Sequence, residues 1–128
     1  YDNPIHSVCQ FKAVGALGIA YEVVRYNLDE LDRAIADEAA HGFVKVLTAP
    51  GKDKILGVTI VSEHAGDLLA EFVLAMRHGL GLNKILATIH TYPTWSEANK
   101  YAAGAWKRAH APEKLLRWVG RYHTWRRG

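Results

Sequence analysis

Two short β-rich segments flank a Pro-Gly turn, and this pattern restricts the fold of the 128-residue chain more than any other feature. Phe43–Leu47 and Ile55–Val61 are rich in β-branched and aromatic residues, and Pro50-Gly51 lies in the loop between them. Strands so close in sequence pair most simply in an antiparallel way, so we expect a β-hairpin. Gly57, inside the second strand, indicates a bulge or a close approach by another segment.

The segments around this hairpin alternate between strand and helix patterns. Residues 19–26 predict a further strand, whereas residues 5–17 have helix-like spacing that ends at Gly18. An acidic, alanine-rich stretch at residues 29–40 indicates a short helix or an irregular turn. After the hairpin, apolar spacing and breakers predict helices at residues 65–78, 83–89 and 94–109. This order predicts an α+β fold with an antiparallel sheet packed against helices, not a parallel sheet of βαβ units.

Charge divides the chain into two parts. The net charge is +3, but seven basic residues and one acid lie from Lys107 onward, which leaves the first 106 residues at −3. Beyond Pro112, apolar residues continue at helical spacing, so we expect residues 110–128 to form a basic amphipathic helical extension. Such a tail can attract nucleic acid or anionic membrane, but a solvated helix face that folds back on the domain is the favoured interpretation.

The single cysteine and the scattered histidines narrow the possible chemistry. Cys9 has no partner for a disulfide within the chain, and we interpret it as a small buried hydrophobe. The seven histidines have no metal-ligand spacing, so no metal site is predicted. No apolar run approaches the roughly 20 residues of a membrane span. Met76 is the only methionine, which favours an excised fragment, and the low cysteine content favours a cytoplasmic location.

Three segments in series carry a family resemblance. Residues 42–46 read GFVKV, residues 55–71 contain ILGVTIV followed by AGDLLAE, and residues 89–97 read IHTYPTWSE. In order and spacing they resemble the interface domain of the FAD-dependent pyridine nucleotide-disulfide oxidoreductases, whose last motif is IHAHPTLSE. The resemblance covers about residues 18–106, and we expect residues 1–109 to form this dimerisation domain.

The resemblance implies a larger flavoenzyme around this domain. Members carry FAD and NAD(P)H domains upstream in the same chain, and they pass electrons through flavin to a CxxC pair. This sequence has neither a GxGxxG turn nor a CxxC pair, so we expect the fragment alone to be inactive and to hold no cofactor. The implied partner is a second copy, because the family's interface domain sends its His-Pro segment into the redox site of the other subunit.

The segment at residues 89–97 contains the candidate catalytic residues Tyr92, Glu97 and His90. The family's catalytic histidine falls on Tyr92, and Glu97 matches the glutamate that orients it. A tyrosine at this position is similar to mercuric reductases, although the tail lacks their cysteine pair. Without a large shift from its usual pKa near 10, a tyrosine donates a hydrogen bond rather than acting as a base. His90 and Pro93 are the candidates for contact with a cofactor.

Structural alternatives stand beside these roles. Residues 94–97 fit a capping box, with Thr94 as the N-cap and Glu97 reaching back to its amide, and we favour this role for Glu97. Tyr92 can be an interface aromatic, and His90 can pair with Tyr92. A different class of function is a free-standing basic module that binds nucleic acid or anionic membrane through residues 107–127.

Apolar side chains on both faces of the hairpin predict a two-fold homodimer. A small domain has few helices to cover two apolar faces, so a second copy is the natural cover. If obligate, the interface should bury roughly 2,000 Å² or more in total.

Overall fold

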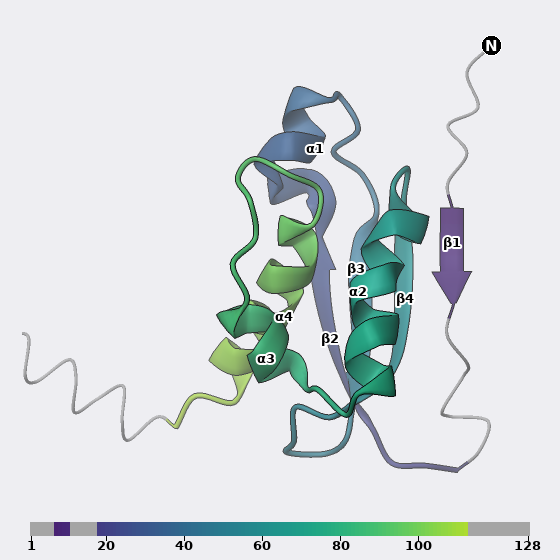
Figure 1. Cartoon of the computed structure of the whole chain (residues 1–128), viewed down its shortest axis with the longest axis vertical. Helices are drawn as coiled ribbons and strands as arrows, with labels where there is room; N and C mark the ends of the chain where they lie inside the picture. The colour runs from purple at the N-terminus through teal and green to yellow at the C-terminus, as the bar shows by residue number, and fades with distance from the viewer. Residues whose placement is uncertain (1–6, 11–17, 113–128) are drawn as a thin grey trace, which may run out of the picture.

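The computed structural model describes residues 7–10 and 18–112, and an antiparallel sheet lies at its centre (Figure 1). Neighbouring strands pair in the order β1-β4-β3-β2, and every pair is antiparallel. The strands of the described residues are β1 (Ser7–Gln10), β2 (Glu22–Asn27), β3 (Phe43–Thr48) and β4 (Ile55–Ser62). The predicted hairpin is the β3–β4 pair at the middle of the sheet. The α+β class with an antiparallel sheet is therefore confirmed.

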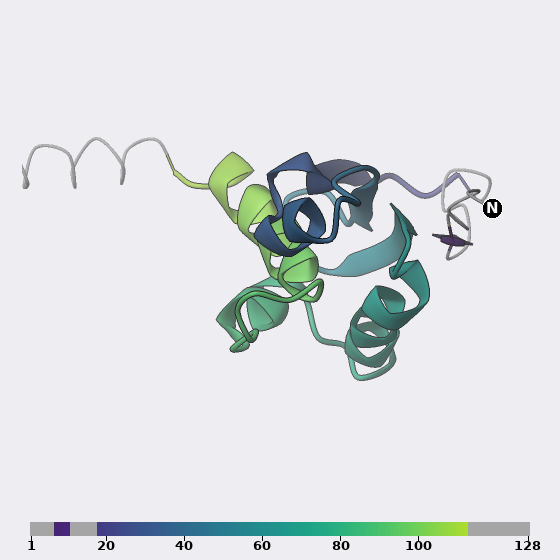
Figure 2. The same cartoon turned by 90° about the horizontal axis from the view of Figure 1, so that it is seen from above.

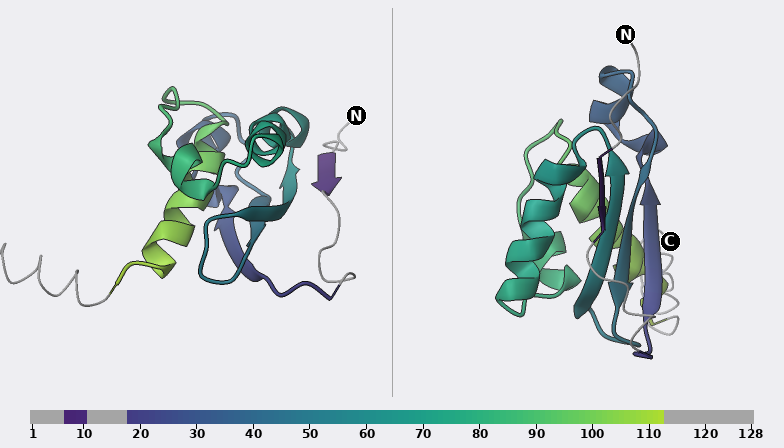
Figure 3. Two further views of the ribbon diagram at one scale, coloured as in Figure 1. Left: turned by 60° about the horizontal axis from the view of Figure 1, so that its bottom comes forward. Right: turned by 90° about the vertical axis from the view of Figure 1, so that its right-hand side faces the viewer.

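The helices gather on one side of this sheet. In two perpendicular views α2, α3 and α4 cover the same face, while α1 lies at one end of the sheet (Figures 2 and 3). The helical elements of the described residues are η2 (Leu28–Glu30), α1 (Asp32–Ala36), α2 (Ala65–Arg77), α3 (Leu82–Ala87) and α4 (Glu97–Ala109). These match the four helices predicted between residues 29 and 109, with shifted ends. None of them is long and apolar enough to cross a membrane.

The helix predicted over residues 5–17 is wrong where the structure describes it. Residues 7–10 form β1, which pairs with the edge of β4 from Ser7 opposite Ser62 to Gln10 opposite Thr59. Apolar spacing favoured a helix here, but the edge of β4 offers unpaired backbone N–H and C=O groups. An extended segment satisfies these groups by pairing with β4. Cys9 consequently belongs to a strand. The remainder of that predicted helix, and the helical tail predicted beyond residue 112, lie outside the described residues.

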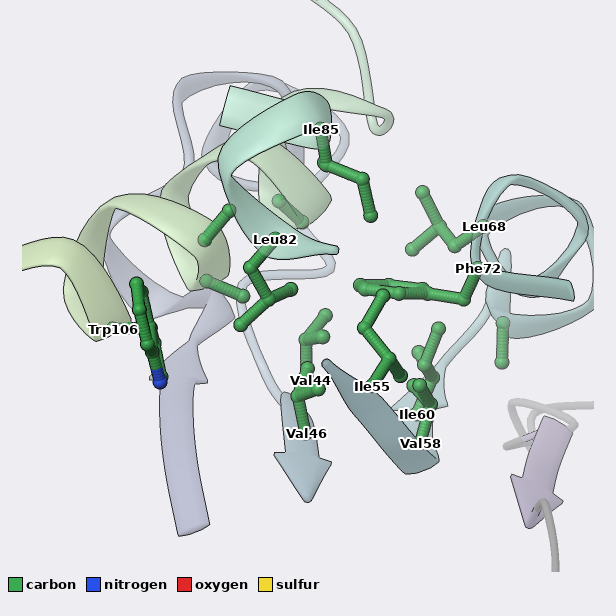
Figure 4. Packing of buried hydrophobic residues seen from close by; sticks show 14 of the residues in the cluster. Val44, Val46, Ile55, Val58, Ile60, Leu68, Phe72, Leu82, Ile85 and Trp106 are labelled. Atoms are coloured by element: carbon green, nitrogen blue, oxygen red, sulfur yellow. The ribbon is translucent and has the colours of Figure 1, made fainter. Parts of the chain in front are cut away.

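The core lies between the inner face of the sheet and the three covering helices. Alternate residues of β3 and β4 point inward, and the Phe72 ring from α2 enters the space between the sheet and α3 (Figure 4). Leu82 and Ile85 from α3 and Trp106 from α4 complete the packing. The large side chains that are fully or almost fully buried include Val44, Val46, Val58, Ile60, Leu68, Phe72, Leu82 and Ile85. Burying them supplies the main driving force for folding.

Apolar side chains lie on both faces of the hairpin, as predicted, with Leu47, Leu56 and Val61 on the outer face, but a polar row crosses that face. Arg25, Lys45 and Thr59 are cross-strand neighbours, and they place a polar row across β2, β3 and β4. The Arg25 guanidinium also lies 3.9 Å from the centre of the Phe43 ring. Apolar side chains remain on both sides of this row, with Val23 exposed on β2.

The predicted irregularity at Gly57 is present. The register shifts so that Leu47 faces Gly57 and Thr48 faces Ile55, which leaves Leu56 as the extra residue of a bulge. The loop before β4 also anchors α3. The carboxylate of Asp53 accepts hydrogen bonds from the backbone N–H of Asn83 at 3.1 Å and from its side-chain amide at 2.9 Å.

Candidate functional site

The predicted site residues lie in and after the loop between α3 and α4, and they do not gather at one point. Three neighbouring elements hold this loop: α1, α2 and the first turn of α4. His90 contacts Glu71 of α2, Tyr92 donates to Asp32 of α1, and Glu97, in the first turn of α4, accepts the backbone N–H of Thr94 in the loop. The loop is therefore held on three sides.

His90 faces inward onto α2. Its Nε2 lies 2.8 Å from Oε1 of Glu71, its Nδ1 lies 3.0 Å from the carbonyl oxygen of Thr88, and only 5% of its side chain is exposed. Both ring nitrogens face oxygen atoms, so the ring donates to both of them only in its charged form. This arrangement pairs His90 with Glu71, not with Tyr92.

A buried amide extends this pair to α4. Nδ2 of Asn99 donates to Oε2 of Glu71 and to the carbonyl oxygen of Leu68, each at 2.8 Å. Asn99 is almost completely buried. The His90–Glu71–Asn99 network thus joins the loop, α2 and α4 through side chains that the sequence analysis did not single out, apart from His90.

Tyr92 points the other way and is 66% exposed. Its hydroxyl donates to Oδ2 of Asp32, at the start of α1, over 2.9 Å. This hydrogen bond, together with the negative charge of Asp32, raises the pKa of Tyr92 above its ordinary value. The peptide bond between Tyr92 and Pro93 is cis, and Pro93 is exposed. The side chain at the predicted catalytic position is therefore at the surface, with its proton already directed to a carboxylate.

Glu97 is buried in the first turn of α4, where it serves as a helix cap. Its Oε2 accepts the backbone N–H of Thr94 at 3.2 Å, and its Oε1 accepts the hydroxyl of Tyr101 at 3.3 Å. The Thr94 hydroxyl instead donates to the carbonyl oxygen of Thr91 and contacts the Ser96 hydroxyl. α4 begins at Glu97 with Ser96 as its N-cap, so the predicted N-cap Thr94 is wrong. The reach of Glu97 back to the Thr94 amide is present, while the Thr94 hydroxyl anchors the loop.

The second aromatic residue of the loop also reaches α1. Nε1 of Trp95 donates to Oδ2 of Asp37 over 2.9 Å, and the Trp95 ring packs 4.6 Å from the ring of His64. Nε of Arg33 donates to the same Asp37 oxygen at 2.8 Å. Hydrogen bonds from Arg33 and then from Trp95 lower the pKa of Asp37. Asp37 therefore remains charged while it holds the indole.

The carboxylates that hold this loop were not predictable from local sequence patterns. Asp32 and Asp37 lie 60 and 58 residues before their aromatic partners, and no local spacing links them. The only available signal was the acidic character of residues 29–40, which also suits an ordinary solvated turn. Among residues 18–112 and 7–10, no group of three potential metal ligands comes together.

The fold and this loop define an α+β module, in which a sheet covered on one face supports a braced surface loop. The family comparison specifies the module. Residues 11–103 match the dimerisation domain of the pyridine nucleotide-disulphide oxidoreductases, and the chain belongs to this family.

Similar curated proteins have names from the same family. The chain is 44% identical over 88 residues to a dihydrolipoyl dehydrogenase of Trypanosoma brucei brucei, covering 69% of this chain and 18% of that protein. It is 40% identical over 92 residues to a leghemoglobin reductase of Vigna unguiculata, covering 72% and 18%. The chain thus spans less than a fifth of the length of these relatives.

Solved structures show the same fold. LpdA from Mycobacterium tuberculosis superposes with a TM-score of 0.71 and 23% identity, covering 83% of this chain and 23% of that chain. The HOCl-induced flavoprotein disulfide reductase RclA from Escherichia coli superposes with a TM-score of 0.63 and 20% identity, covering 68% and 20%. In both, the matched region is a fraction of a longer chain.

Proposed function

We propose that this chain is the dimerisation domain of a flavin-dependent NAD(P)H:disulfide or mercuric-reductase-like oxidoreductase, and that it places Tyr92 in the redox site of a second subunit. The observation that carries the proposal is the position of Tyr92. It is exposed in a loop that is held by three elements, and in the motif resemblance the family's catalytic histidine falls on this position. The names of the relatives support the class of reaction.

FAD and NAD(P)H would have to be held by other parts of a longer protein. Every strand pair of the described residues is antiparallel, and β4 enters α2 through a turn that contains Glu63 and is followed by Asp67. Carboxylates at a helix N-terminus repel a phosphate group, whereas nucleotide sites place glycine and free backbone N–H groups there. Within the described residues, the turn from β4 to α2 therefore does not fit a nucleotide phosphate, and the proposed role of the domain is to pair subunits and supply side chains.

The proposed homodimer can be tested on the chain itself. Ile89 is 94% exposed beside the site loop, and Val23 is exposed on the outer face of the sheet. If the loop lies at the two-fold contact, Ile89→Glu should shift sedimentation at micromolar concentration from dimer to monomer, while Val23→Glu tests the outer face of the sheet, the other predicted contact. A monomeric wild-type chain would contradict the homodimer, and dissociation by Val23→Glu alone would contradict the assignment of the loop to the interface.

The role of Tyr92 requires the longer protein, with its flavin bound. We expect Tyr92→Phe to lower turnover because only the hydroxyl is lost, while Tyr21→Phe, at an exposed tyrosine outside the loop, serves as the control. Comparison of lipoamide with Hg²⁺ as electron acceptor distinguishes the two proposed substrate classes. Equal turnover of Tyr92→Phe and wild type would remove Tyr92 from the mechanism.

Two further assignments stay predictions. One is the cytoplasmic location. The alternative basic binding module depends on residues 107–127, of which the structure describes only the first six, and a salt titration of binding to DNA or anionic vesicles would test it.

A further inference from the structure

Two carboxylates near the ends of α1 accept hydrogen bonds from the two aromatic side chains of the site loop. Asp32 accepts the hydroxyl of Tyr92, and Asp37 accepts the indole N–H of Trp95, each at 2.9 Å. These contacts are directional, and they join segments that are distant in sequence. They fix both the position of the loop and the orientation of the Tyr92 ring relative to α1.

The other carboxylate near Tyr92 is not available for this role. Glu97 uses one oxygen for the backbone N–H of Thr94 and the other for the hydroxyl of Tyr101, and its side chain is buried against α4. In the family resemblance the glutamate at this place orients the catalytic residue. In this chain its geometry is that of a helix cap.

We propose that Asp32 is the positioning residue for Tyr92, and that α1 acts through Asp32 and Asp37 as the brace that holds the site loop. The inference deepens the proposed function and rests on it for its biological meaning. The Asp32–Tyr92 pair, in contrast, is a property of this chain and can be tested without the other subunit or the cofactors.

The Asp32–Tyr92 hydrogen bond determines whether the Tyr92 hydroxyl can donate to, or accept from, another group. A phenol has one proton to donate and can accept through its oxygen, and in Tyr92 that proton is directed at Asp32. Toward any second group, the hydroxyl oxygen of Tyr92 therefore acts as a hydrogen-bond acceptor. The chemistry that fits is a hydrogen-bond donor, such as the S–H of a thiol, rather than a second anion.

The charged and titratable groups that bear on Tyr92 come from two elements. Asp32 belongs to α1, whereas Glu97 and Tyr101 belong to α4, and all three favour the neutral phenol. Asp32 makes the direct hydrogen bond, so its charge should have the largest effect on the pH at which Tyr92 loses its proton.

The test is a tyrosine titration by NMR on the full 128-residue chain labelled at Cζ of tyrosine. Tyr92→Phe assigns the Tyr92 resonance. Asp32→Asn should move the Tyr92 midpoint to lower pH, whereas Asp29→Asn, a neighbour with the same charge and no contact with Tyr92, should leave it in place. Glu97→Gln should shift the midpoint less than Asp32→Asn. Asp32→Ser provides a second variant if Asp32→Asn has a lower melting temperature.

Either of two results would overturn the proposal: an unchanged Tyr92 midpoint in both Asp32 variants, or a larger shift in Glu97→Gln. Failure of the proposed function would look different. The Tyr92 midpoint would respond to Asp32, while Tyr92→Phe in the flavin-loaded longer protein kept full turnover.

Discussion

Nε2 of His90 lies 2.8 Å from Oε1 of Glu71, and this contact joins the loop before α4 to the middle of α2. The other oxygen of Glu71 accepts the buried amide of Asn99. One carboxylate therefore satisfies two polar groups that are shielded from water. The energetic consequence is asymmetric, because removal of the acceptor leaves Nε2 of His90 and one N–H of the Asn99 amide without a partner in a buried place.

We expect Glu71→Ala to lower the free energy of unfolding by about 2–3 kcal/mol, since two hydrogen bonds to a charged group are lost. Asp67→Ala, an exposed carboxylate one turn earlier in α2, should change it by less than about 1 kcal/mol. Urea denaturation followed by far-UV circular dichroism measures both. Equal stabilities of the two variants would show that the network contributes nothing beyond a surface carboxylate.

Glu97→Ala should destabilise the domain more than Thr94→Ala. Glu97 caps the Thr94 amide and accepts from Tyr101, whereas the Thr94 hydroxyl contacts only the loop residues Thr91 and Ser96. We expect losses of about 2 kcal/mol and about 1 kcal/mol respectively. Chemical denaturation of the two single variants gives the comparison. The reverse order would mean that the threonine, not the glutamate, is the main cap of α4.

Gly42→Ala should be strongly destabilising, because Gly42 has a φ of 95° and an added Cβ would overlap the carbonyl oxygen of Val61. We expect a loss of more than about 2 kcal/mol from the contact and the left-handed backbone together. Gly51→Ala is the matched control. Gly51 has a φ of 67° but open space around it, so it should lose only about 1 kcal/mol. Thermal unfolding of both variants separates the steric effect from the conformational effect.

His110 makes the stability of the domain depend on pH. Its Nδ1 donates to the carbonyl of Trp106 and its Nε2 donates to Glu22, and both contacts raise the pKa of His110 above its ordinary value of 6.5. Because the pKa of His110 is raised in the folded state, these contacts stabilise the fold fully below about pH 6.5. Their contribution to the free energy of unfolding is lost as the pH rises through the folded pKa.

Glu22→Gln should therefore lower the pKa of His110 and weaken the pH dependence. A ¹H NMR titration of the imidazole Hε1 resonance measures the midpoint, and Glu63→Gln, whose side chain faces His41, serves as the control. An unchanged His110 midpoint in Glu22→Gln would show that the carboxylate does not stabilise the charged ring.

Local patterns predicted most of the framework and part of the site. The β3–β4 hairpin, its bulge beside Gly57 and the helices after it follow from strand composition, turn residues and apolar spacing, which act over a few residues. The cap by Glu97 was predictable for the same reason, since it spans three residues. The position of Tyr92 was found only through its resemblance to a family motif.

The sequence by itself determined the order of strands and helices between residues 19 and 109 and, through a family motif, the identity of the site loop. Only the tertiary structure decided that residues 7–10 pair with β4, that His90 contacts Glu71, and that Tyr92 donates to Asp32. These partners lie from 19 to 60 residues apart. The physical reason is that backbone propensity and apolar periodicity are local, whereas a hydrogen bond forms between whichever donor and acceptor the packed core brings within about 3 Å.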